Sequence, residues 1–215
     1  MSTKKKLLDL KYGNPAFMFP YWETATKGHA IPAPMGYTKE GLDSLKKAII
    51  KLHKQYKNVD YKDKYLVIGS GATQLLAAAI HVIESDGYVT APKPYFPRFP
   101  GIAGVAGSLF IPYADRVKYS PTPIITSPNN PTGKFQVTPK YDYILDASYN
   151  WPQYTQLGTE YSQGPIIIFS AAKALGLASS RVGWAFVESE EIAKKMQEYI
   201  EMTTSGVSVD GQVRV

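Results

Sequence analysis

The sequence predicts an α/β protein in which a mostly parallel sheet is covered by helices on both faces. Short, continuously apolar runs, typical of strands buried on both faces, recur along the 215 residues. Helical patterns fall between several of these runs, which is the alternation expected of a parallel sheet. Ligands of such sheets bind at the carboxyl ends of the strands, so the residues that directly follow each strand are the candidates for a site.

Residues 1–37 are predicted to form an extended arm, because prolines, glycines and aromatic residues interrupt any regular pattern there. Residues 38–215 are expected to form one large domain. Within it, residues 41–57 have the spacing of an amphipathic helix with a lysine-rich, solvated face, and residues 65–68 have the character of a short buried strand. A helix over residues 73–83 follows the turn at the end of that strand.

The remaining elements are short and alternate along the chain. Strands are predicted over residues 88–90, 108–111, 123–126, 143–145, 166–168 and 182–186, and helices over residues 97–106 and 190–202.

Composition excludes several classes of function. The chain has no cysteine and three histidines without zinc-like spacing, so disulfides, thiolate chemistry and metal catalysis are not expected. The net charge of +6 could indicate nucleic-acid binding, but no basic and aromatic recognition motif accompanies the lysines, and we favour a solvated helix face. Without a long apolar segment or a secretory signal, we expect no membrane association and a cytoplasmic location.

Lys173 is the residue that most directly indicates chemistry. It follows the apolar run at 166–169 and Ser170, so a buried strand delivers its amine to the edge of the sheet. Asp146 ends the run at 143–145 as if from a neighbouring strand, and Arg181 lies eight residues after the lysine. An amine for an aldehyde, a carboxylate for a ring nitrogen and a guanidinium for a phosphate together suit pyridoxal 5'-phosphate.

Two loops contribute further candidates. The turn at residues 69–74 joins a strand to a helix and could hold a phosphate on free backbone N–H groups, although alone it is equally a structural turn. Residues 127–133 follow another strand, and Asn130 could donate to a phenolic oxygen on a cofactor ring. Tyr149, three residues after Asp146, could be a second donor. A structural turn is the alternative for residues 127–133, and a core aromatic is the alternative for Phe96 in the peptide at 94–97.

Taken together, these segments resemble the fold-type I pyridoxal-phosphate-dependent aminotransferases, in particular the branch of alliinases and plant tryptophan aminotransferases. The resemblance covers nearly the whole chain in order. It rests on Gly13-Asn14-Pro15, Tyr21-Trp22, residues 69–74, 127–133, 146–152, 170–184 and 206–214.

The resemblance implies a role for each matching residue. Lys173 would form the internal aldimine, Asp146 would face the ring nitrogen, and Asn130 and Tyr149 would face the phenolic oxygen. Phe96 would stack on the ring. The remaining cofactor-binding residues would be Tyr21, Ala72, Thr73, Ser170 and Arg181, with Tyr37 a weaker assignment toward a partner's phosphate. The family also implies a homodimer.

The sequence departs from the family pattern in ways that leave the activity open. Ala172 replaces the serine before the lysine, and we expect no C-terminal small domain with the family's carboxylate-binding arginine. We therefore expect a PLP-dependent aminotransferase that converts an amino acid to a keto acid, with aromatic amino acids among the candidates. The alternatives are a C–S lyase, as in alliinase, and a truncated cofactor-binding protein without activity. Serine acyl transfer through Ser170 and Lys173 has little support, because its other motifs do not follow.

Overall fold

The computed structural model describes residue 24 and residues 36–83, 87–112, 122–140, 142–158 and 162–215, of which Thr38–Val215 form one compact unit. A seven-stranded sheet lies at its centre, in the order β1-β7-β6-β5-β4-β2-β3. Only β7, among the described strands, runs antiparallel to its neighbours β1 and β6, which confirms the prediction of a mostly parallel sheet. The strands are β1 (Tyr65–Gly69), β2 (Tyr88–Ala91), β3 (Leu109–Pro112), β4 (Thr122–Thr126), β5 (Ile144–Asp146), β6 (Ile166–Ser170) and β7 (Gly183–Val187).

The helices agree with the sequence prediction to within a few residues at each end, and three short elements were not predicted. The helices are α2 (Asp43–Tyr56), α3 (Gly71–Ile83), α4 (Phe99–Val105) and α6 (Glu190–Thr204), with the unpredicted α5 (Ala171–Ala174), the 3-10 turn η3 (Ala178–Ser180) and α7 (Val209–Arg214). No helix in the described part of the chain is long and apolar enough to cross a membrane.

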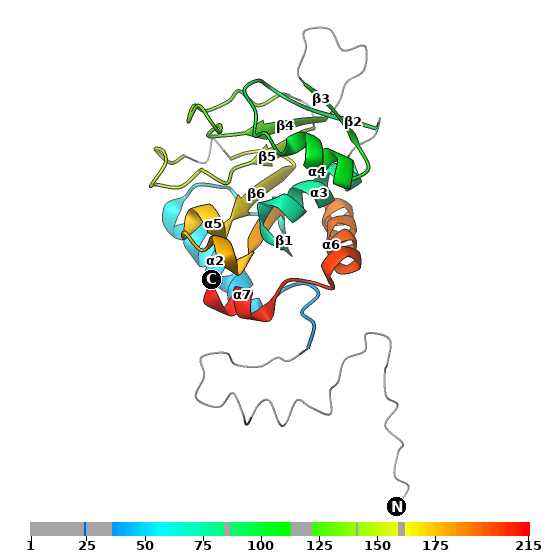
Figure 1. The fold of residues 1–215 in the computed structure, drawn as a ribbon. Coiled ribbons are helices and arrows are strands. Elements are labelled where there is room, and N and C mark those ends of the chain that lie inside the picture. Colours follow the sequence, from blue (N-terminus) through cyan, green and yellow to red (C-terminus); the bar gives the residue numbers. More distant parts are fainter. Residues whose placement is uncertain (1–23, 25–35, 84–86, 113–121, 141, 159–161) are drawn as a thin grey trace, which may run out of the picture. The chain divides into compact units, whose positions relative to one another are not determined.

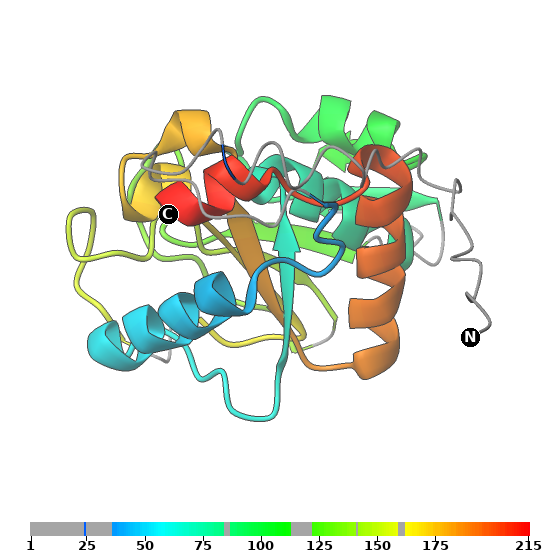
Figure 2. The ribbon, with the colours of Figure 1, turned by 90° about the horizontal axis from the view of Figure 1, so that it is seen from below.

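Helices cover both faces of the sheet, and the alternation of side chains along β6 shows how. Ile166 and Ile168 belong to the apolar cluster under α3, α4 and α6, whereas Ile167 and Phe169 belong to the cluster on the side of α2. All four side chains are fully buried. Figures 1 and 2 show α2 and α6 on opposite sides of the strands, so a strand with apolar side chains at every position is the expected sequence.

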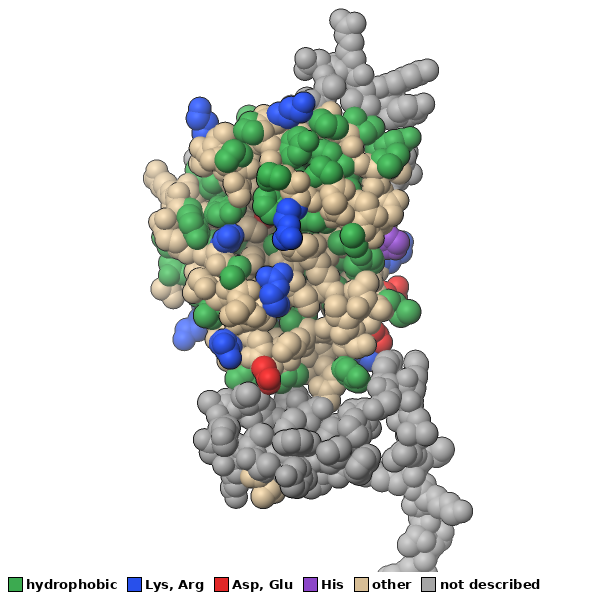
Figure 3. Space-filling model, viewed as in Figure 1, with side chains coloured by type: hydrophobic (Ala, Val, Ile, Leu, Met, Phe, Trp, Pro, Cys, Tyr) green, Lys and Arg blue, Asp and Glu red, His purple; other side chains and the backbone are tan. Residues whose placement is uncertain are grey.

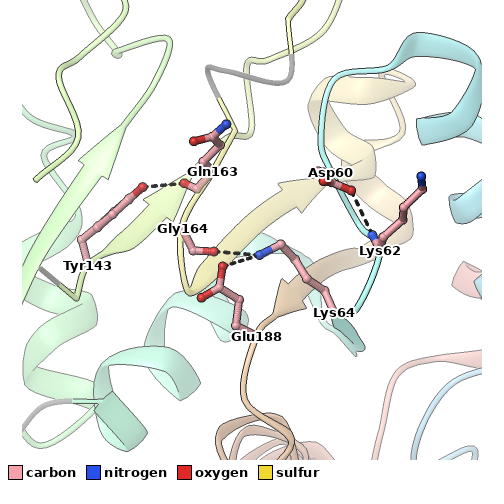
Figure 4. A network of polar contacts seen from close by, with 7 residues as sticks. All are labelled: Asp60, Lys62, Lys64, Tyr143, Gln163, Gly164 and Glu188. Carbon is pink, nitrogen blue, oxygen red and sulfur yellow. Dashed lines mark hydrogen bonds and ion pairs between the residues drawn. The ribbon is translucent and has the colours of Figure 1, made fainter. Parts of the chain in front are cut away.

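Polar contacts join the strands at the edge of the sheet where β5 and β6 begin. Lys64 Nζ, just before β1, donates to the carbonyl of Gly164 at 3.2 Å and pairs with Glu188 Oε1 at 2.6 Å (Figure 4). The hydroxyl of Tyr143 donates to the carbonyl of Gln163 at 2.6 Å. These contacts join the start of β6 to the start of β1 and the end of β7. The candidate site lies at the opposite end of these strands.

Candidate active site

The predicted functional residues that the structure describes come together at the carboxyl ends of β1, β2, β4, β5 and β6. Because β7 is antiparallel, its first residues lie at the same edge, and Arg181 reaches the site from there. The side chains enclose a cavity of about 210 Å³. The residues that line it are Ala72, Thr73, Leu76, Phe96, Thr126, Asn130, Asp146, Ser148, Tyr149, Ser170, Ala172, Lys173, Ala178 and Arg181.

The turn from β1 into α3 depends on two glycines, one against the side chain of Arg181 and one against the backbone of the turn itself. Gly71 has φ +76°, and a Cβ there would lie 2.7 Å from Arg181 Nη2. A Cβ on Gly183 would lie 2.7 Å from the carbonyl carbon of Gly71 and 2.9 Å from the amide nitrogen of Ala72. The first turn of α3 therefore rests directly on β7, with Ala72 and Thr73 at the cavity wall. The N-terminal amides of a helix lack partners within that helix, so this turn can bind an anion.

Asp146 is a buried carboxyl group at the end of β5. It is 6% exposed, and its Oδ1 accepts a hydrogen bond from the backbone N–H of Ser148 at 3.1 Å. Burial raises the pKa of Asp146, while the hydrogen bonds from Ser148 and the charge of Lys173 act in the opposite direction. It forms no ion pair with any described Lys or Arg. A cationic N–H donor placed in the cavity would stabilise its charged form.

Asn130, Tyr149 and Lys173 come from three different connections and meet at the cavity. Asn130 Nδ2 donates to the hydroxyl oxygen of Tyr149 at 3.0 Å, and Lys173 Nζ lies 5.4 Å from the centre of the Tyr149 ring. The lysine is carried by α5, the single helical turn that follows β6. The amine, the phenol and the amide are thus neighbours at the cavity.

Ser170 and Arg181 form hydrogen bonds with backbone groups of the site, and each has further O–H or N–H donors available for a ligand. The Ser170 hydroxyl oxygen accepts from the N–H of Ala172 at 3.2 Å, which caps α5 and leaves the hydroxyl proton available. Arg181 donates to the carbonyl oxygens of Ser70 and Ala178, each at 3.3 Å, and a guanidinium has five donors in all. Arg181 is also in the left-handed region, with φ 50°, an uncommon conformation for a residue with a side chain.

Phe96 lies at the cavity wall, after β2, with its ring edge-on to Phe99 at 5.7 Å between centroids. Tyr21, also expected at the cofactor, lies outside the described residues. Five further residues line the cavity without having been predicted from the sequence: Leu76, Thr126, Ser148, Ala172 and Ala178. Thr126 could have been found, since it ends β4 and pairs in register with Asp146 at the end of β5.

Two observations test whether these residues fit pyridoxal phosphate. The hydroxyl of Thr126 is buried at the cavity without a hydrogen-bond partner, and Asp146 is a buried carboxyl group that forms no ion pair with a described side chain. Both are left for a ligand with polar groups. Asp146 would face a protonated ring nitrogen, and the Asn130–Tyr149 pair would face the phenolic oxygen. Lys173 would face the aldehyde, and the first turn of α3 with Arg181 would face the phosphate. The donor set therefore fits the cofactor.

Basic side chains are more numerous than acidic ones on the face drawn in Figure 3, in keeping with the net charge of +6. Among the described residues, no group of three or more His, Cys, Asp or Glu side chains gathers as metal ligands would.

The comparisons with known proteins extend over nearly the whole chain. The model of a family described as "Allinase" matches residues 8–215. Tryptophan aminotransferase-related protein 2 of Arabidopsis thaliana is 33% identical over 98% of this chain and 53% of its own. Alliin lyase of Allium cepa is 28% identical over 96% of this chain and 49% of its own. The chain thus spans about half the length of these relatives.

Solved structures show the same fold at lower identity. An aspartate aminotransferase of Thermotoga maritima superposes with a TM-score of 0.70 at 19% identity, over 94% of this chain and 62% of that one. An Escherichia coli protein with a methionine aminotransferase function superposes with a TM-score of 0.67 at 18% identity, over the same shares. At this level of identity the likeness shows the fold, an α/β sheet of the kind found in the aminotransferases.

Proposed function

Because this chain belongs to the allinase family, whose enzymes have fold type I and depend on pyridoxal 5'-phosphate, we propose that it binds this cofactor through Lys173 and acts as an aminotransferase. The observation that carries the proposal is the convergence of Lys173, Asp146, Asn130 and Arg181 on one cavity. Residues 38–215 are then the cofactor-binding large domain, and residues 1–37 an arm that precedes it.

Each side chain has a proposed part in binding. Asp146 accepts the N–H of the ring nitrogen, and its charge keeps that nitrogen protonated. Asn130 and Tyr149 donate to the phenolic oxygen. Phe96 covers one face of the ring and excludes water. The phosphate is held by Ser170, Arg181 and the first amides of α3, at Ala72 and Thr73.

When bound, pyridoxal phosphate supplies an electron-poor ring that accepts the electron pair left behind when a bond to the Cα of an amino acid breaks. The chain supplies the base. Lys173 carries the one primary amine among the described residues that line the cavity, so its Nζ is the group that removes the proton from Cα. The phenol of Tyr149 lies beside that amine, with the ring centre 5.4 Å from Nζ, and limits where it can move.

The substrate is proposed to be an amino acid and the product the corresponding keto acid. Aromatic amino acids are the first candidates, because relatives at 28–33% identity are named tryptophan aminotransferase-related proteins. A homodimer and a cytoplasmic location complete the proposal. Light scattering on the purified protein and fractionation of expressing cells measure these two properties.

A C–S lyase is the second candidate, because alliin lyases of Allium species are 27–28% identical to the chain. The same base would remove the same proton, and a substituent on Cβ would then leave. The products separate the two activities: a keto acid that retains the side chain indicates transamination, whereas pyruvate with a released sulfur fragment indicates the lyase.

The first experiment tests cofactor attachment. The purified protein is mixed with pyridoxal phosphate, reduced with borohydride, digested and examined by mass spectrometry. A cofactor adduct on the peptide that contains Lys173 is expected, and it should be lost in Lys173→Ala but retained in Lys140→Ala, which removes an exposed lysine. An adduct that survives in Lys173→Ala would contradict the assignment.

The second experiment tests the reaction. Tryptophan, alanine and an S-substituted cysteine are added separately to the loaded protein, and the absorbance spectrum and the products are recorded. A spectral change with formation of the keto acid is expected. If no amino acid changes the spectrum, the chain is a cofactor-binding protein without activity.

A further inference from the structure

The helical turn that carries Lys173 is too short to hold itself in place. α5 has four residues, and Leu175 N–H returns to the carbonyl of Ala171 at 2.9 Å to close it. A helix this short gains little from its own hydrogen bonds, and its last carbonyl groups have no partner within it. The position of Lys173 therefore depends on contacts from outside α5.

One side chain outside the helix bonds both of its last carbonyl groups. Gln153 Nε2 donates to the carbonyl oxygen of Lys173 at 2.8 Å and to that of Ala174 at 3.0 Å. The other end is capped by the Ser170 hydroxyl. Gln153 is thus the direct side-chain contact to the backbone of the lysine itself.

Gln153 is held in turn by the loop that follows β5. Trp151, two residues earlier, is 1% exposed in the core, and Tyr154 N–H donates to the Trp151 carbonyl at 2.9 Å. The same loop carries Tyr149, whose ring lies beside Lys173 Nζ. The loop therefore touches the lysine at both ends, with a phenol beside the amine and an amide on the backbone.

We propose that Gln153 is a positioning residue that fixes the backbone of Lys173, so that the amine is already placed to react with the aldehyde of the cofactor. This inference rests on the proposed function. In the step concerned, Lys173 Nζ replaces the aldehyde oxygen, a carbon–nitrogen double bond forms and one water leaves. A lysine placed beforehand loses less conformational freedom in that step, which favours the bonded state.

A comparison of two ligands separates this role from a general structural one. Pyridoxal phosphate can react with Lys173, whereas pyridoxamine phosphate has the same ring and phosphate but no aldehyde. Pyridoxamine phosphate also carries an aminomethyl group in place of the aldehyde, so the ratio of the two dissociation constants in each variant is compared with the ratio in the wild type, and the change reports the covalent step. The ratio is measured by fluorescence titration for the wild type, Gln153→Ala, Gln153→Glu, Gln153→Lys and Gln156→Ala, the last a control that removes an exposed glutamine of the same loop.

The preference for pyridoxal phosphate is expected to fall about threefold to tenfold in Gln153→Ala and Gln153→Glu, since neither can donate to the two carbonyl groups. Gln153→Lys keeps a donor at the end of a helix and should retain most of the preference, and Gln156→Ala should retain all of it. Binding of pyridoxamine phosphate should not change in any variant. Circular dichroism confirms that each variant is folded.

An unchanged preference in both Gln153→Ala and Gln153→Glu would overturn the inference, as would an equal loss of affinity for both ligands. The proposed function fails in a different way: the wild type itself would then show no preference and no borohydride-stable adduct at Lys173. The two failures are thereby distinguished in one set of titrations.

Discussion

The buried carboxylate of Asp146 is expected to favour binding of the cofactor and to lower the stability of the ligand-free protein. Burial raises the pKa of this carboxyl group, so the folded protein holds the proton more tightly than the unfolded chain does. Its contribution to stability is therefore present at low pH and is lost as the pH rises through the folded pKa. A protonated ring nitrogen in the cavity would reverse this, because it gives the charged carboxylate a partner.

Asp146→Asn should separate the two effects. At pH 8 the free energy of unfolding of the ligand-free protein should rise by about 0.5 to 2 kcal/mol, because a buried charge is removed while the acceptor for Ser148 N–H is kept. The affinity for pyridoxal phosphate should fall. Urea unfolding and fluorescence titration measure the two quantities.

Asp142→Asn is the matched control, since it removes the same charge from an exposed position. Its free energy of unfolding should stay within about 0.5 kcal/mol of the wild type. A loss of stability in Asp146→Asn at pH 8 would show that the carboxylate is already well solvated in the ligand-free protein.

Arg181→Ala should weaken the binding of pyridoxal phosphate by about 1 to 3 kcal/mol, because it removes charge-assisted hydrogen bonds from a phosphate that other donors also hold. Isothermal titration calorimetry measures the affinity. Arg214→Ala, at an exposed position in α7, keeps the change in net charge but should leave the affinity unaltered. Equal losses in both variants would indicate a general effect of charge and move the phosphate away from Arg181.

At the level of elements, the contact between the first turn of α3 and β7 sets the backbone geometry of the proposed phosphate site. In Gly183→Ala the new methyl group would meet the backbone of Gly71 and Ala72 at under 3 Å, so α3 has to move. Such a change typically costs about 1 to 3 kcal/mol of stability, and here the affinity for inorganic phosphate should fall as well. Thermal unfolding and a phosphate titration measure both.

Gly104→Ala offers the opposite case. This glycine lies inside α4, and a Cβ there meets nothing within 4 Å. Alanine is the better helix former, so stability should rise by about 0.5 to 1 kcal/mol with phosphate binding unchanged. If Gly183→Ala, like Gly104→Ala, raised the stability and left phosphate binding unchanged, the close approach of α3 to β7 would not matter for phosphate binding.

Most of the elements could be predicted from local patterns, and the exceptions have physical reasons. The apolar run at 166–169 indicates a buried strand in any sheet, and β6 is that strand. The direction of β7 is not encoded in the same way, because a strand buried on both faces has the same apolar sequence whether it runs parallel or antiparallel. α5 has four residues, too few for a helical period to be seen.

The cavity residues also divide into those that a local sequence pattern indicates and those that it does not. Asp146 could be predicted because a charged residue directly after an apolar run is conspicuous, and Lys173 because it is the first charged residue after the run at 166–169; both line the cavity. Thr126 is harder to predict from the sequence, because threonine is common in strands and nothing distinguishes it from an ordinary strand residue. Gln153 acts through two backbone carbonyl groups that only the folded chain brings near it, and no sequence motif marks that contact.

Across the whole molecule, a buried histidine links α2 to the sheet. His53 is fully buried among the rings of Trp151, Phe169, Trp184 and Phe186. Trp184 Nε1 donates to His53 Nε2 at 2.8 Å, so Nδ1 carries the proton and donates to Asn58 Oδ1 at 2.7 Å. Burial lowers the pKa of His53 to about 4, and the imidazole is neutral in the folded protein at pH 7.

His53 should make the protein sensitive to acid. Between its unfolded pKa of 6.5 and the folded value of about 4, the unfolded chain binds a proton that the folded protein does not. Its contribution to stability is therefore complete above pH 6.5 and decreases as the pH falls, by about 3 kcal/mol in total. Urea unfolding at several pH values between 4 and 7 measures the slope.

His53→Gln should flatten that slope, because the amide can donate and accept but does not titrate in this range. Some stability will be lost at every pH, since the shape differs. His81→Gln changes an exposed histidine and should keep the wild-type slope. An unchanged slope in His53→Gln would assign the acid sensitivity to other groups.

The bonds of Lys64 with Glu188 and Gly164 lie at the edge of the sheet where β5 and β6 begin, whereas the cavity lies where these strands end. Because the two regions are separate, residues at either end of the strands can be substituted without disturbing the other end. Substitutions around Lys64 and Tyr143 are expected to change thermal stability without altering the cavity, and a library of variants confined to the residues that line the cavity would change ligand binding on the same fold.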